Sequence, residues 1–212
     1  MSDHLNKMDE QYDDDIFNDI AIVGVSGRFP GADNVDELWQ NLLNSVESVQ
    51  FFSDEEILAS GVSEEELRDP NFVKANILLD NVEYFDASFF DFTPREAEVM
   101  DPQMRLGLEC AWEALEDAGC NPEMSNGPIG VFGGASTSAY FLFNVFPQFQ
   151  KGKFVNSLQA QVGFDKDFFA THIAYKCNLT GPCINVNTAC STSLVAVHVA
   201  VQSLLNGECR IA

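Results

Sequence analysis

Apolar and polar positions along the chain predict short buried strands between capped helices. Two apolar runs, residues 20–25 and 129–132, lead into glycine-containing segments and are predicted to be strands. A third run, residues 183–186, follows Gly181 and Pro182 and includes two β-branched residues. The pattern therefore predicts three buried strands at these positions.

Capping residues mark the predicted helix starts. Asn34 is predicted to begin a helix through Ser45, with Leu38, Trp39 and Leu42 facing inward. Three capping boxes, each a Ser or Thr followed three residues later by Glu, predict further starts: Ser53 with Glu56, Ser63 with Glu66, and Thr93 with Glu96.

Two longer helices are predicted in the second half of the chain, over residues 102–118 and 167–176. Gly107 lies inside the first of them, where glycine costs about 1 kcal/mol relative to alanine, so close packing is expected there. Residues 69–92 show no clear period and are predicted to be an irregular loop packed on the core.

The most informative stretch is GPCINVNTACSTSLVAVHVAVQSLLNGEC, residues 181–209. It predicts a strand, a small-residue turn at residues 187–189, and an apolar helix from about Cys190 to Leu205. At a helix N-terminus, unpaired N–H groups and the helix dipole favour thiolate over thiol. Those N–H groups, including that of Cys190, can also stabilise an oxyanion. The residues thus indicate covalent acyl transfer through Cys190.

The same stretch has a purely structural interpretation. Free cysteine is among the most buried residue types, so Cys190 is equally well explained locally as a small buried residue that starts a helix. A base for the thiol would have to be His172 or His198. His198 lies about 12 Å along the same helix at ~1.5 Å per residue and cannot reach the thiol. His172 could approach it only through tertiary folding.

Composition excludes several functions. The net charge is −22, from 33 acidic and 11 basic residues, so neither nucleic acid nor an anionic membrane surface is an expected partner. No apolar run is long enough for a transmembrane helix, and the acidic N-terminus does not resemble a secretory signal. The six cysteines and three histidines show no metal-ligand spacing, so no metal site is expected. Reduced, cytoplasmic thiols are expected instead.

Three motifs carry a resemblance to a known family. They are TACSTSLVA around Cys190, IAIVGVSGRFPGA at the first predicted strand, and FDASFFDFTPREAEVMDPQMRLGLECAWEALEDAG. The glycines of the second motif, Gly24, Gly27 and Gly31, do not form GxGxxG, so no dinucleotide cofactor is expected. Together the motifs resemble β-ketoacyl synthases, in particular the ketosynthase domains of modular type I polyketide synthases.

The resemblance implies a thiolase-like α/β fold with αβαβα layers, of which this chain is the N-terminal half. It implies a ketosynthase domain over residues 18–212. Residues 1–17 before it are charged and low in aliphatic side chains, so they are predicted to be a flexible acidic leader. By the match, Cys190 is the acyl-accepting nucleophile. Asn187 stands where many members have Asp, which we interpret as a subfamily difference.

The resemblance also implies a two-stage reaction. An acyl group passes from the phosphopantetheine thioester of an acyl carrier protein to the cysteine, and malonyl-carrier protein then loses CO₂ and condenses with it. The domain itself is expected to bind no cofactor, to be a homodimer when intact, and to be cytoplasmic. A fatty-acid-type synthase and a noncatalytic scaffold or interaction fragment are the alternatives.

The family's decarboxylation histidines lie downstream of the nucleophile, one in an HGTGT-like motif. The chain stops 22 residues after Cys190 and contains no such motif. We therefore expect it to be a fragment of a longer synthase that is inactive alone.

Overall fold

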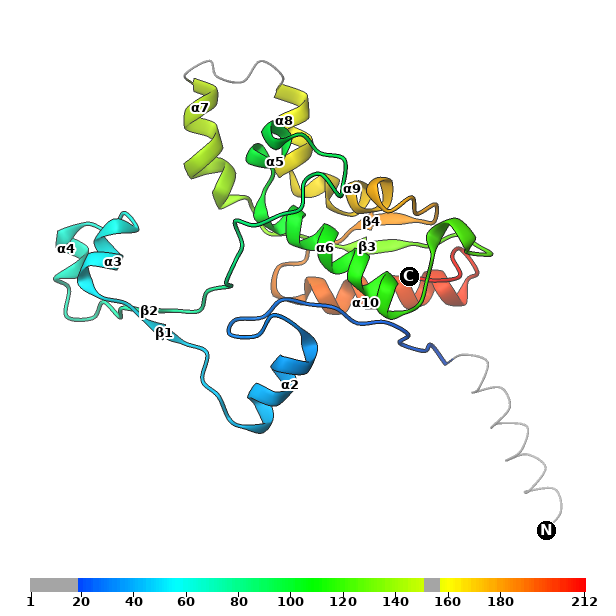
Figure 1. Cartoon of the computed structure of the whole chain (residues 1–212), viewed down its shortest axis with the longest axis horizontal. Helices are drawn as coiled ribbons and strands as arrows, with labels where there is room; N and C mark the ends of the chain where they lie inside the picture. The colour runs from blue at the N-terminus through cyan, green and yellow to red at the C-terminus, as the bar shows by residue number, and fades with distance from the viewer. Residues whose placement is uncertain (1–18, 151–156) are drawn as a thin grey trace, which may run out of the picture. The chain divides into compact units, whose positions relative to one another are not determined.

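A computed structural model describes residues 19–150 and 157–212 (Figure 1). The predicted leader, residues 1–17, lies outside the described residues. The chain divides into two compact units. Residues 26–84 form one, and residues 85–212 form the other together with the segment that ends at Val25.

The unit of residues 26–84 consists of three helices and a two-stranded antiparallel sheet. The helices are α2 (Val35–Leu43), α3 (Asp54–Ala59) and α4 (Glu64–Leu67), and the strands are β1 (Gln50–Phe51) and β2 (Ala75–Asn76). Both predicted capping boxes are present, since the side chains of Ser53 and Ser63 accept hydrogen bonds from the backbone N–H groups of Glu56 and Glu66. The inward-facing prediction for α2 is wrong for Trp39 and Leu42, because both are exposed in this unit.

The larger unit contains most of the helices and a parallel pair of strands. Its elements in chain order are α5 (Pro94–Val99), α6 (Pro102–Asp117), η1 (Pro122–Met124), β3 (Val131–Gly133), η2 (Phe141–Val145), α7 (Phe146–Gln150), α8 (Ser157–Phe164), η3 (Lys166–Phe168), α9 (Phe169–Lys176), β4 (Cys183–Asn185), η4 (Ala189–Ser191) and α10 (Thr192–Leu205). None of the helices within the described ranges has both the length and the apolar character required to span a bilayer.

Strands β3 and β4 are parallel and in register, with Val131 opposite Cys183 and Gly133 opposite Asn185. Helices α9 and α10 lie on opposite sides of this pair (Figure 1), and both pack on β3. Helix, strand pair and helix thus form layers, which agrees with the predicted layered α/β fold.

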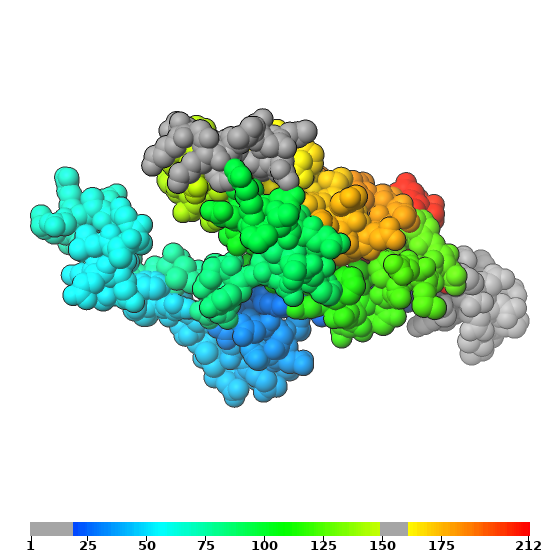
Figure 2. Space-filling view, turned by 45° about the horizontal axis from the view of Figure 1, so that its top comes forward, coloured from blue at the N-terminus to red at the C-terminus, as the bar shows by residue number. Residues whose placement is uncertain are grey.

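The core lies where α6 packs on α9. On the outside of the molecule, green residues of the middle of the chain lie next to the orange residues around α9 (Figure 2). Leu108 of α6 is fully buried in the core, and Ile173 of α9 and Cys177, which follows α9, are buried beside it. A β-carbon on Gly107 would lie 2.7 Å from the ring of Phe169. The close packing predicted at this glycine is therefore confirmed.

One predicted strand is not formed. Residues 20–25 have no strand pairing in the described part of the chain, and Ile22 is 85% exposed. A strand needs a neighbour to satisfy its backbone groups, and the sequence pattern cannot supply one. This segment is joined to α6 by a 2.9 Å hydrogen bond that the Val25 N–H donates to the Asp117 carboxylate.

Helix α9 also begins differently from its prediction. The sequence predicts a start at Asp167, but this residue lies within the 3-10 turn η3. Asp165 caps that turn instead, because its carboxylate accepts a hydrogen bond from the Asp167 N–H at 3.1 Å. The helix end near residue 176 is as predicted.

Candidate functional site

The predicted strand, turn and helix around Cys190 are present in the larger unit. Strand β4 ends at Asn185, and the next residue, Val186, is buried and donates its N–H to the Gly133 carbonyl at 2.8 Å. The chain then turns through residues 187–189 into the 3-10 turn η4 and helix α10. Cys190 therefore lies one residue before Ser191, the N-cap of a 14-residue helix.

Cys190 is exposed, which contradicts its alternative interpretation as a small buried residue. Within the described part of the chain, no oxygen accepts the backbone N–H of Cys190. An unbonded N–H at the start of a helix can donate to a negative oxygen on a bound substrate. The same residue thus combines an exposed cysteine with the unbonded N–H donor predicted for an acyl-transfer site.

The turn before Cys190 has an unusual backbone. Ala189 has a φ of 54°, in the left-handed region that is costly for residues with a β-carbon. Two hydroxyl groups brace this turn. Thr192 Oγ1 accepts a hydrogen bond from the Thr188 N–H at 3.0 Å, and Ser191 Oγ donates to the Thr188 carbonyl at 2.9 Å.

Gly134, just after β3, packs directly under this turn. A β-carbon there would lie 2.0 Å from the Val186 carbonyl oxygen and 2.8 Å from Thr192 Cγ2. The sequence pattern predicts a capping side chain at Thr188, which makes no cap hydrogen bond in the structure, and it assigns no role to Gly134, Ser191 or Thr192. The available signal is the run of Thr and Ser around the cysteine in TACST, and the glycine pair that ends β3.

The other five thiols differ from Cys190 in their surroundings. Cys177 and Cys209 are buried, and Cys110, Cys120 and Cys183 are half-buried. Burial raises the pKa of the thiols of Cys177, Cys183 and Cys209, which keeps them protonated and poorly nucleophilic. Cys190 is consequently the thiol best suited to react with an external substrate.

Neither candidate histidine is joined to Cys190 by any interaction of the described residues. His198 is exposed on α10. His172 on α9 packs edge-on against Phe92, with ring centroids 5.3 Å apart, and its Nδ1 atom is buried without a partner. Burial, with a smaller contribution from Lys176, lowers the pKa of His172. Its contacts are therefore those of a core residue.

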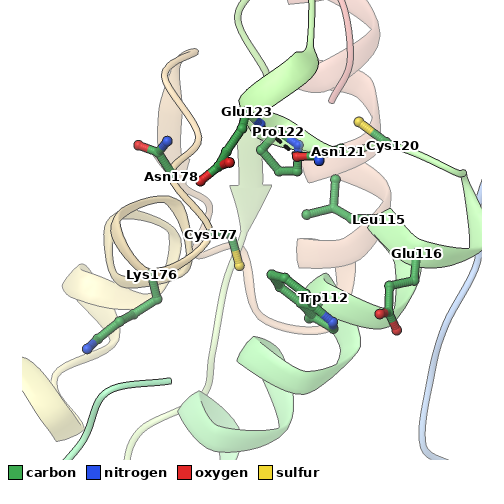
Figure 3. A pocket seen from close by; sticks show the side chains of 10 residues that line it. All are labelled: Trp112, Leu115, Glu116, Cys120, Asn121, Pro122, Glu123, Lys176, Cys177 and Asn178. Atoms are coloured by element: carbon green, nitrogen blue, oxygen red, sulfur yellow. Dashed lines mark hydrogen bonds between the residues drawn. The ribbon is translucent and has the colours of Figure 1, made fainter. Parts of the chain in front are cut away.

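A separate cavity of about 470 Å³ lies at the ends of α6 and α9 (Figure 3). Trp112 and Leu115 of α6, Pro122 of η1 and Cys177 after α9 contribute its apolar side chains. None of its lining residues belongs to the strand, turn and helix that carry Cys190. The cavity is thus distinct from the cysteine site.

The arrangement suits a class of protein in which an exposed cysteine at a strand–helix turn carries an acyl group. The family described as "Beta-ketoacyl synthase, N-terminal domain" matches residues 17–212. The chain therefore belongs to the β-ketoacyl synthase family, and its match is to the N-terminal domain.

Relatives and solved structures agree with this family. A phenolphthiocerol/phthiocerol polyketide synthase of Mycobacterium tuberculosis is 48% identical over 201 residues, which cover 92% of this chain and 14% of that protein. Polyketide synthase PksM of Bacillus subtilis is 37% identical, over 93% of this chain and 5% of that protein. This chain thus spans a small part of these relatives.

Ketosynthase twelve from the bacillaene polyketide synthase of Bacillus amyloliquefaciens matches 91% of this chain with a TM-score of 0.76 and 34% identity. The ketosynthase from module 1 of the same synthase in strain FZB42 matches with a TM-score of 0.75 and 37% identity. In both cases this chain covers 33% of the solved chain. The fold is therefore thiolase-like, and the chain corresponds to its N-terminal half.

Proposed function

We propose that this chain supplies the nucleophile half of a condensing ketosynthase in polyketide biosynthesis. The observation that carries the proposal is the state of Cys190, the exposed thiol among six, whose own N–H is unbonded at the start of α10. The synthase relatives and the ketosynthase structures support the polyketide type over the fatty-acid type.

The first stage follows from the geometry of Cys190. The thiolate sulfur attacks the carbonyl carbon of an acyl thioester, and the new carbon–sulfur bond forms as negative charge develops on the oxygen. The Cys190 N–H can donate to that oxygen. The bond to the pantetheine sulfur then breaks, and the leaving pantetheine thiolate takes up the proton that the Cys190 thiol released.

In the second stage malonyl-carrier protein loses CO₂, and the electron pair of the broken carbon–carbon bond attacks the acyl carbon on Cys190. A carbon–carbon bond forms, the cysteine thiolate leaves, and a β-ketoacyl-carrier protein results. We assign the first stage to residues of this chain. The phosphopantetheine belongs to the carrier protein, which is the proposed partner.

The remaining parts of the proposal concern organisation and location. Residues 18–212 form the N-terminal ketosynthase domain, preceded by a leader over residues 1–17. The match to the β-ketoacyl synthase family supports a homodimer of the intact ketosynthase. Six cysteines without a disulfide support a cytoplasmic location.

The test uses the full-length synthase that contains this chain, supplied with acyl- and malonyl-carrier protein. Wild type is expected to form a β-ketoacyl product that is detected by mass spectrometry of the carrier protein. Cys190→Ala should abolish the product, whereas Cys120→Ala, which alters a half-buried thiol of the separate cavity, should retain it. Product from Cys190→Ala at the wild-type rate would contradict the proposal.

A further inference from the structure

The backbone on one side of Cys190 is held by side chains from the other side. The N–H of Thr188 is bonded to the hydroxyl of Thr192, and the carbonyl of Thr188 is bonded to the hydroxyl of Ser191. Ser191 Oγ also lies 3.0 Å from Thr188 Oγ1. These bonds close a ring of backbone and side chain around Ala189 and Cys190.

Ala189 needs such a restraint. Its φ of 54° is a conformation that residues with a β-carbon rarely adopt and that persists where the surroundings impose it. The bond from the Thr188 N–H to Thr192 Oγ1 spans this residue, so its loss would allow Ala189 to relax to a negative φ. Because Cys190 is the next residue, that relaxation would redirect its thiol and its N–H together.

The hydrogen bond of Thr192 is not a helix cap. A capping side chain accepts from an N–H in the first turn of its own helix. Thr192 is the first residue of α10, and its hydroxyl accepts instead from Thr188, four residues earlier and outside the helix. Its methyl group faces Gly134, where a β-carbon would be only 2.8 Å away, so the side chain is confined on that side.

We propose that Thr192 is a positioning residue whose hydroxyl holds Ala189 at positive φ and thereby aims the Cys190 thiol and N–H at the thioester carbonyl. The inference rests on the proposed acyl transfer to Cys190 and deepens it. It assigns to Thr192 no contact with the substrate. Its role is exerted through the hydrogen bond to the Thr188 N–H.

The first experiment compares Thr192→Val with Thr192→Ser in the full-length synthase. Valine keeps the methyl that faces Gly134 and replaces the hydroxyl by a second methyl, whereas serine keeps the hydroxyl. The probe is the hexanoyl thioester of N-acetylcysteamine, and the readout is the rate constant of Cys190 acylation by intact-mass analysis. We expect T192V to be slower by about ten-fold or more, since small misplacements of reacting groups cost rates of that order, and T192S to be within about two-fold of wild type.

The second experiment tests the restraint on Ala189 by rescue. Glycine adopts positive φ without the steric cost that alanine has, so A189G should recover a large part of the rate lost in T192V. A role of Thr192 in stability alone predicts no such recovery. The melting temperatures of all variants are expected to stay close to that of wild type. If T192V does not accumulate in the cells that express it, T192A is used in its place.

The outcomes separate this inference from the proposed function. If wild type is not acylated at Cys190, the proposed function fails. If wild type is acylated and T192V reacts at the same rate, the role of Thr192 is refuted while the proposed function stands. T192S as slow as T192V, or no recovery in the A189G/T192V variant, would also overturn the inference.

Discussion

A β-carbon on Gly134 would lie 2.0 Å from the carbonyl oxygen of Val186, so glycine is required where the chain after β3 passes the end of β4. Val186 is also bonded through its N–H to the Gly133 carbonyl at 2.8 Å. The backbone that leads to Cys190 is thus fixed by a close approach of two chain segments that are distant in sequence.

We predict that Gly134→Ala destabilises the fold by about 2 kcal/mol, because the added methyl meets backbone rather than a movable side chain. It should also lower the acylation rate of Cys190, since Val186 lies at the base of its turn. Gly163→Ala is the matched control, because its β-carbon would meet its nearest neighbour, Met100, at an ordinary 3.4 Å. Denaturant unfolding of the synthase checks both variants, and equal stability of the two would contradict the prediction.

We predict that stability falls as the pH is lowered through the ordinary histidine pKa of about 6.5. Burial, and then Lys176, lower the pKa of His172, while the nearby Glu96 partly opposes this. A lowered pKa in the folded state means that the unfolded state binds the proton more tightly, so acid favours unfolding. The contribution of His172 to the free energy of unfolding is fully present at pH 8, where the histidine is neutral in the folded and unfolded states.

The check is thermal unfolding of the synthase at pH 8, 7 and 6. Between pH 8 and pH 6, the melting temperature of His172→Gln should fall less than that of wild type. His198→Gln, which changes an exposed histidine, should keep the wild-type dependence. Identical slopes for wild type and His172→Gln would show that His172 does not couple folding to pH.

Features that depend on local interactions are predictable from the sequence. The capping boxes at Ser53, Ser63 and Thr93 are present because each joins a side chain to a backbone group three residues away. The start of a helix next to Cys190 is predictable from the local change from a small-residue turn to an apolar run, although neither Thr188 nor Ser191 makes a side-chain cap hydrogen bond there.

Features that depend on distant segments are missed or predicted wrongly. The strand predicted over residues 20–25 is absent because a strand requires a partner, and none of the described strands pairs with it. The prediction that Trp39 on α2 faces inward is wrong because an amphipathic pattern marks an apolar face but does not show which segment, if any, covers it. The positive φ of Ala189 and the close approach at Gly134 arise from tertiary contacts, which leave no periodic signal in the sequence.

We predict that the 212-residue polypeptide, expressed alone, self-associates and unfolds without a sharp transition. Ile22 is 85% exposed and Leu194 of α10 is 76% exposed, with Val23 and Val197 exposed beside them. Apolar surface of this kind favours association unless another part of a protein covers it. Light scattering after size exclusion and calorimetry are the measurements, with a full-length ketosynthase as the control. A monomer with a sharp thermal transition would contradict the prediction.

The role of Cys190 is tested by locating the acyl group on the protein. Full-length synthase is incubated with acetyl, butanoyl and hexanoyl thioesters of N-acetylcysteamine, digested, and sequenced by tandem mass spectrometry. We predict one acyl group on Cys190 in wild type and in Cys120→Ala, and none on the ketosynthase of Cys190→Ala. An acyl group that remains on a single ketosynthase residue of Cys190→Ala, at the wild-type extent, would show that Cys190 is not the nucleophile.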